Sequence, residues 1–258
     1  MKFSIVIPAF NEEALLDESL SKLKQSLEVF LEEGHSYELI LCDNNSTDRT
    51  AQIALNHDVQ VIFEPENQIS KARNKGASIA SSDYLIFIDA DSFASKPLFK
   101  EFLKKISQMN VLGGGALVYM KTNGIISFMA LHLWRCISRL FRWAPGSFIF
   151  CRRDVFEKLG GFSTEYFASE EIEFSKRLKR EARCQKKIKA RIVILRNSIL
   201  TSDRKLHLYG VSDYLKLVFK YLLKGEKILK KKENLPIWYD GKRYPALRPT
   251  RIADLIFR

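Results

Sequence analysis

The sequence predicts an α/β fold in which a mostly parallel sheet carries helices on both faces. Short apolar runs of strand type alternate with longer amphipathic stretches, and several of those runs end at a proline or an aspartate. That alternation is typical of parallel strands joined by crossover helices. With 258 residues, 46% of them hydrophobic and 28% charged, the chain is long enough and apolar enough for a substantial globular core.

The first 110 residues show the alternation most regularly. Strands are predicted at residues 4–8, 38–43, 59–63 and 84–89, and helices at about 12–33, 46–56, 70–80 and 95–108. The first helix repeats leucine at helical spacing and is expected to end at Gly34. Ser46 or Thr47 is the expected cap of the second helix, and Ser95 of the fourth.

The second part of the chain is less regular. Strands are predicted at residues 111–119, 148–151 and 191–196, and a short helix at 154–159 is closed by Gly160 and Gly161. A helix capped by Ser169 is expected to run to about residue 182, and a long basic helix is expected from Ser212. Residues 125–143 are apolar, with arginines recurring on a helical period. We find neither an internal repeat nor a linker that separates two domains.

Charge divides the chain into two unlike parts. Residues 1–110 hold 11 Lys or Arg against 17 Asp or Glu, whereas residues 111–258 hold 31 against 13. The acidic part suits a metal ion, and the basic part suits an anionic partner such as phosphate, an acidic saccharide or a membrane surface. We expect no nucleic-acid partner, because the sequence has no helix-turn-helix, zinc-finger or RNP signature.

The sequence also predicts where the protein works. It has no apolar run near the ~20 residues of a membrane span and no signal-peptide pattern at its start. Four cysteines without metal-type spacing are expected to be reduced core residues, so we predict a cytoplasmic protein (Cys42, Cys136, Cys151 and Cys184). Peripheral attachment to the cytoplasmic membrane face is an option, through residues 125–143 or through one basic face of the last helix (Lys216, Lys220, Lys224, Lys227 and Lys231). A solvated helix packed on the body is the alternative for that basic face.

Polar residues follow three of the predicted strands. Residues 8–11, Asp43 and residues 89–91 each come just past a strand end. Ligands of open parallel sheets bind at the carboxyl ends of the strands, so we expect these residues to meet in one crevice. Asp89 and Asp91 together offer two carboxylates to a hard cation, with a diphosphate completing its shell. An ordinary acidic turn is the alternative, since two aspartates at this spacing form a weak motif.

Five short sequence blocks, which follow one another along the chain, make that interpretation more specific. They cover roughly residues 3–180 and read SIVIPAFNEE (4–13), LCDNNSTD (41–48), ARNKG (72–76), FIDADS (87–92), and GGF (160–162) followed by Glu170-Glu171. Together they make the chain resemble the inverting glycosyltransferases of family 2, which have the GT-A fold. The resemblance implies a metal-dependent transfer of a sugar from a nucleotide diphosphate donor to an acceptor hydroxyl.

The resemblance also assigns donor-binding residues. It implies that the first block contacts the nucleoside through Pro8, Ala9, Phe10 and Glu12. It also implies that Asp43 binds the base edge. Core packing is the alternative for Phe10, and a helix cap for Asp43. Arg73, Asp89 and Ala90 are expected along the donor diphosphate, and Arg204, or else His207, on a loop that contacts the phosphates or the metal.

The same resemblance implies the metal and the base. Asp89 and Asp91 would hold Mn²⁺ or Mg²⁺, and Glu171 would take the proton of the acceptor hydroxyl. The family usually has Glu-Asp where this chain has Glu-Glu, so Glu170 is the fallback. Favourable charge at a helix N-terminus is the alternative for both residues. Glu173 and Arg177 form an i, i+4 pair that we interpret as structural.

These observations predict one GT-A domain over residues 1–232, with a nucleotide-sugar half (1–110), an acceptor half (111–210) and the basic helix (211–232), followed by a tail (233–258) packed on the body. A UDP-sugar is the favoured donor, and a saccharide or lipid-linked acceptor of glycan or cell-envelope synthesis is expected. A sugar-phosphate nucleotidyltransferase would need a Gly-rich basic loop after the first strand, where this chain is acidic. A non-catalytic membrane-surface module would not explain two aspartates after a buried strand together with Glu170-Glu171.

Overall fold

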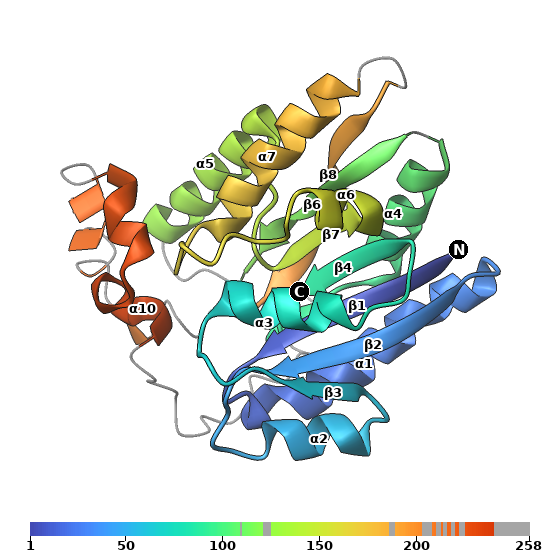
Figure 1. The fold of residues 1–258 in the computed structure, drawn as a ribbon, viewed down its shortest axis with the longest axis horizontal. Helices are drawn as coiled ribbons and strands as arrows, with labels where there is room; N and C mark the ends of the chain where they lie inside the picture. Colours follow the sequence, from blue (N-terminus) through green and yellow to red (C-terminus); the bar gives the residue numbers. More distant parts are fainter. Residues whose placement is uncertain are drawn as a thin grey trace.

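The computed structural model describes residues 1–108, 110–120, 125–185, 189–202 and 225–239, and seven single positions between 208 and 221. Within these residues an eight-stranded sheet has the order β3-β2-β1-β4-β7-β6-β8-β5 (Figure 1). Its strands are β1 (Lys2–Ala9), β2 (Ser36–Asp43), β3 (Gln60–Phe63), β4 (Tyr84–Ile88), β5 (Ser92–Phe93), β6 (Val111–Tyr119), β7 (Phe148–Arg152) and β8 (Arg191–Thr201).

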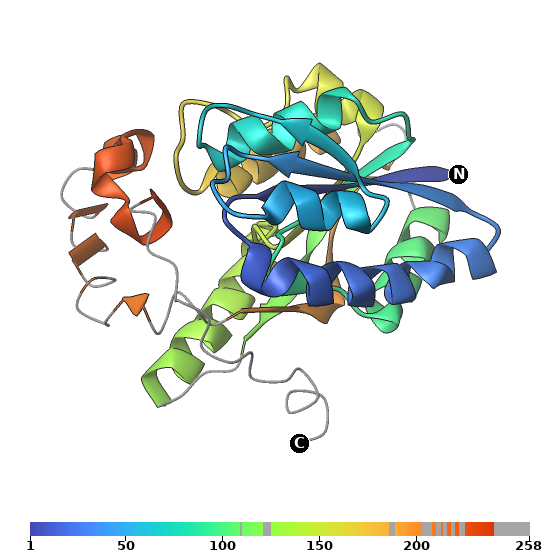
Figure 2. The ribbon, with the colours of Figure 1, turned by 90° about the horizontal axis from the view of Figure 1, so that it is seen from below.

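The helices lie on both sides of that sheet. They are α1 (Glu13–Glu32), α2 (Thr50–Asn56), α3 (Ile69–Ser78), α4 (Lys96–Gln108), α5 (Ile125–Phe141), α6 (Arg153–Lys158) and α7 (Glu170–Cys184), with η2 (Gly225–Lys230), η3 (Lys232–Asn234) and α10 (Pro236–Tyr239) near the C-terminus. One apolar core joins α1, α2 and α4 to the sheet, and a second joins the α3, α6 and α7 side (Figure 2). The predicted fold class, with helices on both faces, is therefore confirmed.

The sheet changes character in its middle. β1 pairs in parallel with both β2 and β4, and β2 pairs in parallel with β3. β7 then runs antiparallel between β4 and β6, whereas β6 and β8 are parallel and β5 closes the edge antiparallel to β8. The regular first part of the sequence thus forms the parallel part of the sheet. The two-residue strand β5 was not predicted, because it is too short to show a strand period.

Close packing explains one glycine of the third sequence block. A Cβ built at Gly76 of α3 would lie 2.4 Å from Cγ1 of Val6 in β1. Any side chain there would push α3 away from the strand, so glycine sets how closely α3 approaches the centre of the sheet. The same helix carries Arg73, whose position therefore depends on this approach.

The helix boundaries predicted at Gly34, Ser95 and Ser169 agree with the structure, whereas the one predicted at Ser46 or Thr47 is wrong. Gly34 follows α1 at φ +71°, and Ser95 Oγ accepts the Leu98 N–H of α4 at 3.4 Å. Neither Ser46 nor Thr47 caps α2, which begins at Thr50, where Asp48 Oδ1 accepts the backbone N–H at 2.9 Å. Ser169 precedes α7 at φ +63° without a side-chain cap, and its carbonyl accepts the N–H groups of the first turn instead.

The C-terminal part departs from the predicted long basic helix. Gly225 has φ +61°, and Gly225–Lys230 form a 3₁₀ helix, so an unbroken α-helix does not reach residue 232. Most of residues 211–224, and residues 240–258 of the expected tail, lie outside the described residues. In the described part of the expected tail, Leu235 and Ile237 are buried.

Two further expectations concern cysteines and membranes. Cys42 and Cys151 are free and buried as expected, but Cys136 and Cys184 are exposed, so the prediction of four core cysteines is wrong for these two. Their helices, α5 and α7, turn these positions outward. In the described part of the chain, we find no helix of sufficient length and apolarity to span a bilayer.

Candidate functional site

The carboxyl ends of β1 and β2 join two of the sequence blocks. Ala9 and Asp43 are paired in the strand register, and the chain after β1 turns at Asn11, which has φ +53°. The Asn11 N–H donates to Ser46 Oγ at 3.0 Å, and Asn11 Oδ1 accepts the Thr47 N–H at 2.8 Å. These reciprocal bonds fix the two strand-end loops to each other. The first and second blocks are therefore one structural unit.

The residues predicted to bind the nucleoside lie on this unit. Pro8 and Ala9 are buried, and Phe10 is half-buried. Asp43 is 7% exposed, and its Oδ1 accepts the Ser46 N–H at 3.0 Å, so its local turn role is real. The Glu12 N–H donates to Thr50 Oγ1 at 2.8 Å, which ties this block to the start of α2. The structure thus gathers the predicted residues at adjacent strand ends.

A buried ionic cluster lies around Arg73, which is 1% exposed. One guanidinium nitrogen donates to Glu170 Oε1 at 2.6 Å, and the other donates to Asp89 Oδ1 and to the Gly146 carbonyl, both at 2.9 Å. Three elements and one loop meet here, namely α3, α7, the end of β4 and the loop before β7. Arg73 therefore connects the third, fourth and fifth blocks of the sequence.

The charges of this cluster shift one another's pKa values. Burial works against the charge of Arg73, but Asp89, Glu170 and Glu171 outweigh it and raise the pKa of the guanidinium. Burial raises the pKa of Glu170, and Arg73 opposes that shift. Because Glu170 is bonded directly to Arg73, we place the negative charge of the Glu170–Glu171 pair on Glu170.

Glu171 is the second carboxyl group of this pair, and its pKa lies above the ordinary value. Burial, and then the charge of Glu170, raise its pKa to about 8, although Arg73 lowers it. The Glu171 side chain is half-buried and lies against the loop before β7, where a Cβ built at Gly146 would be 3.8 Å from its Cδ. A carboxyl group with a pKa near neutrality is suited to accept and release a proton.

The fifth sequence block holds α3 in place. Asn74 Nδ2 donates to the Phe162 carbonyl at 2.8 Å, and Asn74 Oδ1 accepts the Phe162 N–H at 2.9 Å. Gly161, at φ +70°, leaves room for this, because a Cβ there would lie 2.6 Å from Asn74 Oδ1. Arg177, paired with Glu173 as predicted, donates to the carbonyls of Leu159 and Gly161. The glycine block therefore positions Arg73 through its neighbour Asn74.

The residues predicted to hold a metal follow β4. Asp89 is partly exposed, Ala90 is buried, and the Asp91 carbonyl accepts the Ser202 N–H of the chain after β8 at 3.1 Å. Among the residues that the structure describes, no group of three or more His, Cys, Asp or Glu side chains is placed to hold a metal ion. Mg²⁺ in proteins is often held by only one or two carboxylates together with substrate phosphates. Asp89 and Asp91 fit that kind of site.

Two features near the cluster were not predicted. The Gly146 carbonyl accepts from Arg73, yet a single turn glycine gives no sign of this in the sequence. Tyr239 of α10 has a buried hydroxyl near the Ile69 N–H of α3, and burial and then Glu170 raise its pKa. Its ring packs on Phe167 at 5.7 Å. A single aromatic in an irregular segment carries no signal that sequence reasoning detects.

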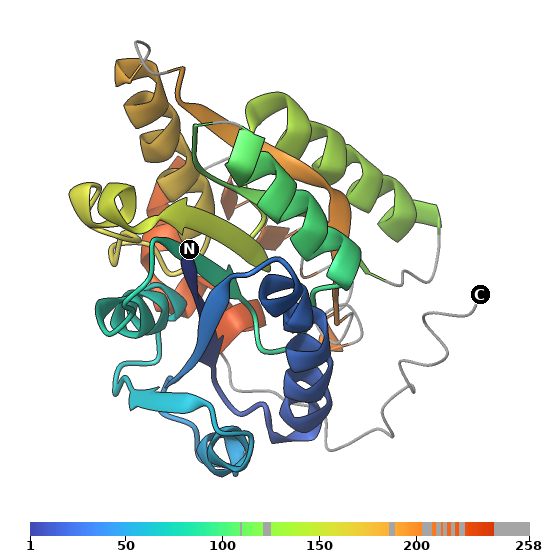
Figure 3. The ribbon, with the colours of Figure 1, turned by 90° about the vertical axis from the view of Figure 1, so that its right-hand side faces the viewer.

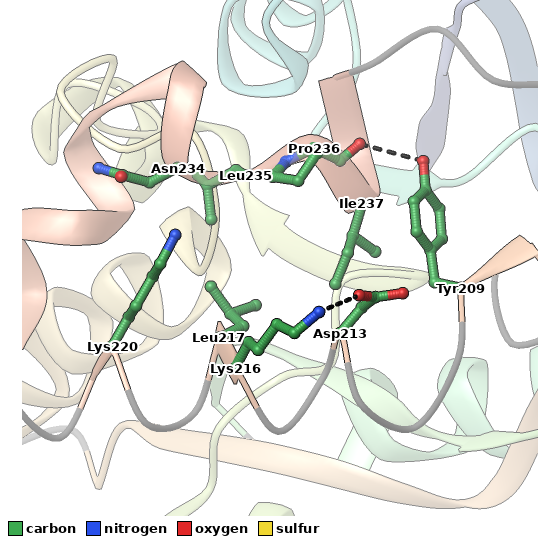
Figure 4. A pocket seen from close by; sticks show the side chains of 9 residues that line it. All are labelled: Tyr209, Asp213, Lys216, Leu217, Lys220, Asn234, Leu235, Pro236 and Ile237. Atoms are coloured by element: carbon green, nitrogen blue, oxygen red, sulfur yellow. Dashed lines mark hydrogen bonds and ion pairs between the residues drawn. The ribbon is translucent and has the colours of Figure 1, made fainter.

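Other predicted positions lie elsewhere. Arg204 and its alternative His207 are outside the described residues. A pocket of about 230 Å³ lies between positions 209–220 and residues 234–237, and Figure 4 shows its lining, including the Lys216–Asp213 ion pair and the bond from the Tyr209 hydroxyl to the Pro236 carbonyl. None of the predicted site residues lines it. It is therefore separate from the Arg73 cluster.

Known proteins resemble this chain in sequence. A profile of glycosyl transferase family 2 matches residues 4–160, which is more than half of the chain. The chain belongs to glycosyl transferase family 2. It is 28% identical over 120 residues to the glycosyltransferase EpsJ of Bacillus subtilis, covering 43% of this chain and 33% of EpsJ. It is 27% identical over 187 residues to the glycosyltransferase AglE of Haloferax volcanii, covering 67% and 60%. The alignments thus span less than two thirds of these relatives.

Solved structures resemble it in fold. TarS of Staphylococcus aureus superposes with a TM-score of 0.59 at 17% identity, over 92% of this chain and 78% of the TarS fragment. The mannosyltransferase PcManGT of Pyrobaculum calidifontis, solved with GDP-Man and Mn²⁺, superposes with a TM-score of 0.62 at 15% identity, over 94% and 66%. These likenesses confirm the predicted GT-A fold.

Proposed function

We propose that this chain is an inverting glycosyltransferase that moves a sugar from a nucleotide diphosphate donor, with a UDP-sugar favoured, to an acceptor hydroxyl. One observation carries the proposal. Asp89 and the Glu170–Glu171 pair are gathered around the buried Arg73, beside strand ends that bear the predicted nucleoside residues. Membership of glycosyl transferase family 2 supports the same reaction class.

On the donor side, the loops after β1 and β2 would hold the nucleoside. Asp43 would accept from the base edge, Glu12 would accept from the ribose hydroxyls, and Pro8, Ala9 and Phe10 would form the apolar floor. Structural neighbours solved with UDP, UDP-GlcNAc or GDP-Man support a nucleotide donor for this fold, and the UDP complexes favour UDP. Arg73, which is 1% exposed, would support the diphosphate path from behind by holding Asp89, and Arg204 would approach the path from the segment that follows β8. Ala90 would lie beside that path.

Asp89 and Asp91 are the residues that would hold Mn²⁺ or Mg²⁺. Two neighbours were solved with Mn²⁺, which supports a divalent metal at this position of the fold. When bound, the metal supplies positive charge that offsets the charge accumulating on the leaving diphosphate. Arg73 orients Asp89 for that task, since its guanidinium donates to Asp89 Oδ1.

On the acceptor side, Glu171 would act as the base. With a pKa of about 8, Glu171 is ionised in only part of the molecules near neutral pH. In that ionised form its carboxylate would take the proton of the acceptor hydroxyl while that oxygen bonds to the anomeric carbon, and the bond from this carbon to the diphosphate would break. Attack opposite the leaving group inverts the anomeric centre. Glu170 is bonded to Arg73 at 2.6 Å, and this bond commits it to positioning rather than to proton transfer. This reasoning favours Glu171 over the fallback.

The acceptor would be an anionic or lipid-linked saccharide of glycan or cell-envelope synthesis. The positive charge of residues 111–258 supports this class. So does a relative whose name describes transfer of N-acetylglucosamine to poly(ribitol-phosphate). Assaying transfer to neutral and to lipid-pyrophosphate acceptors tests it, and a preference for neutral acceptors would contradict it.

Calorimetric titration with UDP, GDP and dTDP, with and without Mn²⁺, tests the donor site. We expect one nucleotide to bind only with metal, and we expect Asp91→Ala to lose that binding. Glu66→Gln is a matched control, because Glu66 is an exposed carboxylate paired with Lys71 outside the cluster. If no nucleotide binds the wild-type chain, the proposed function is wrong.

A further inference from the structure

The outer face of α5 carries an apolar ridge. Met129, Leu133, Cys136 and Leu140 follow one another at helical spacing and are all exposed, with 63%, 63% and 78% of the Met129, Leu133 and Leu140 side chains accessible. Phe128 and Phe141 flank the ridge and are also exposed. Contiguous apolar surface of this kind marks an interaction site rather than an ordinary solvated helix.

A row of arginines runs beside the ridge. Arg135, Arg139 and Arg142 recur at steps of four and three, and residues 125–143 contain no Asp or Glu. Arg139 and Arg142 are exposed, and Arg135 is half-buried beside Ser198, whose Oγ accepts from it at 3.5 Å. Apolar side chains on one line and cations on the next are the pattern of a helix that lies in a membrane interface.

The neighbouring helix α7 adds positive charge at the same end. Lys179 Nζ donates to the Phe141 carbonyl at 2.7 Å, which places this ammonium at the last turn of α5. Burial, then Arg183 and Arg142, lower the pKa of Lys179. These three cations therefore repel one another. An external anion would relieve that repulsion.

We propose that the outer face of α5, with Arg142, Lys179 and Arg183 at its end, docks the chain on a membrane rich in anionic phospholipid. The apolar ridge would enter the acyl boundary, and the arginines would bind lipid phosphates. A second copy of this chain fits less well, because a symmetric contact through this face would bring like charges together. Figures 2 and 3 show α5 on the outside of the body.

The position of α5 gives the docking a functional consequence, which rests on the proposed function. The chain leaves α5 at Arg142 and reaches Gly146, the Arg73 partner beside Glu171, four residues later. Four residues span at most about 14 Å. The Ala144 N–H donates to Ser175 Oγ at 3.0 Å and fixes this connection to α7. A docked α5 therefore brings Glu171 close to the bilayer surface, where a lipid-linked acceptor would present its hydroxyl.

Vesicle co-sedimentation of the full chain tests the docking. We expect binding to phosphatidylcholine vesicles that contain phosphatidylglycerol and little binding to phosphatidylcholine alone. The double variant Leu133→Gln/Leu140→Gln should bind neither kind of vesicle. The double variant Arg139→Gln/Arg142→Gln should bind the anionic vesicles roughly fivefold more weakly for each arginine removed, and added salt should reduce this difference.

Matched controls separate this face from general surface effects. Leu55→Gln removes an exposed leucine from α2, and Arg153→Gln/Lys158→Gln removes two charges from α6, on the opposite side of the body from α5 in Figure 3. Both should bind vesicles like the wild type. Leu55→Gln and the α5 variants should keep wild-type melting temperatures, since the substituted side chains are exposed.

Two outcomes would overturn the docking proposal. One is a wild-type chain that binds metal and nucleotide but ignores anionic vesicles. The other is light scattering that shows a dimer dissociated by Leu133→Gln/Leu140→Gln, which would assign this face to self-association. Vesicle binding without any nucleotide binding would instead contradict the proposed function and leave the docking standing.

Discussion

Helix α3 and the end of α5 both carry arginine, but they use it in opposite ways. Arg73 of α3 is 1% exposed and bonded to two carboxylates and a carbonyl of this chain. Arg139 and Arg142 of α5 are exposed, on a segment without a carboxylate. Arg73 is thus positioned by internal partners, whereas the arginines at the end of α5 are open to a partner from outside. The comparison distinguishes buried charge, which holds site residues in place, from exposed charge, which is available to bind a partner.

Replacing one arginine of each kind by alanine should give the largest difference between the two regions, and that difference is in stability. Arg73→Ala leaves Glu170 buried without its partner, and we expect the free energy of unfolding to fall by about 3–5 kcal/mol. Arg139→Ala should change it by about 0.5 kcal/mol or less, because the side chain is solvated. Denaturant unfolding of the two variants beside the wild type gives both numbers. Equal costs would show that the Arg73 cluster is not a stabilising element.

Glu171→Gln should give the next largest effect, on transfer rather than on folding. Loss of a general base lowers kcat by about 10²–10⁴, while nucleotide affinity should be unchanged. Glu173→Gln, two residues along the same helix and paired with Arg177, is the matched control and should retain transfer. Glu170→Gln should instead lower stability, because it weakens the bond to Arg73. Wild-type transfer by Glu171→Gln would place the base elsewhere.

The raised pKa of Glu171 also predicts how stability depends on pH. Its folded-state pKa of about 8 lies above the ordinary value of 4.5, so the folded chain holds this proton more tightly than the unfolded chain. The stability linked to this group is therefore complete below pH 4.5, falls as pH rises toward about 8, and is constant above it. Relative to wild type, Glu171→Gln should gain melting temperature across that window. A constant difference over the whole range would contradict the shift.

The parallel part of the fold and the positions of its site residues were predictable. The repeated strand-then-helix pattern and the polar residues after Pro8, Asp43 and Asp89 are local signals, and a parallel sheet brings them together by geometry alone. The blocks around Arg73 and Gly161 also appear in the sequence. Their physical link, from Asn74 to Phe162, does not, since it joins residues 88 positions apart.

The second part of the chain shows where sequence reasoning ends. The antiparallel insertion of β7 and the short β5 depend on which strands find an edge, and no residue pattern reports that. The prediction of a continuous helix through Lys227 is wrong, because Gly225 adopts φ +61°, which is not a helical conformation, and a 3₁₀ helix begins there. Tyr239 reaches the cluster only because residues 225–239 cross the loop before α7, where the Phe167 N–H donates to the Leu229 carbonyl at 2.8 Å.

The smallest predicted effect sharpens the account of how Arg73 is positioned. Gly160 and Gly161 both have positive φ, +75° and +70°, so alanine strains the backbone at either site. Only at Gly161 would the new Cβ also meet Asn74 Oδ1, at 2.6 Å, and displace the residue next to Arg73. We therefore expect Gly160→Ala to cost about 1 kcal/mol and Gly161→Ala about 2–3 kcal/mol. Gly161→Ala should also weaken nucleotide binding in calorimetry while Gly160→Ala does not. Equal losses in both variants would mean that the glycine pair serves the turn alone and does not position Arg73.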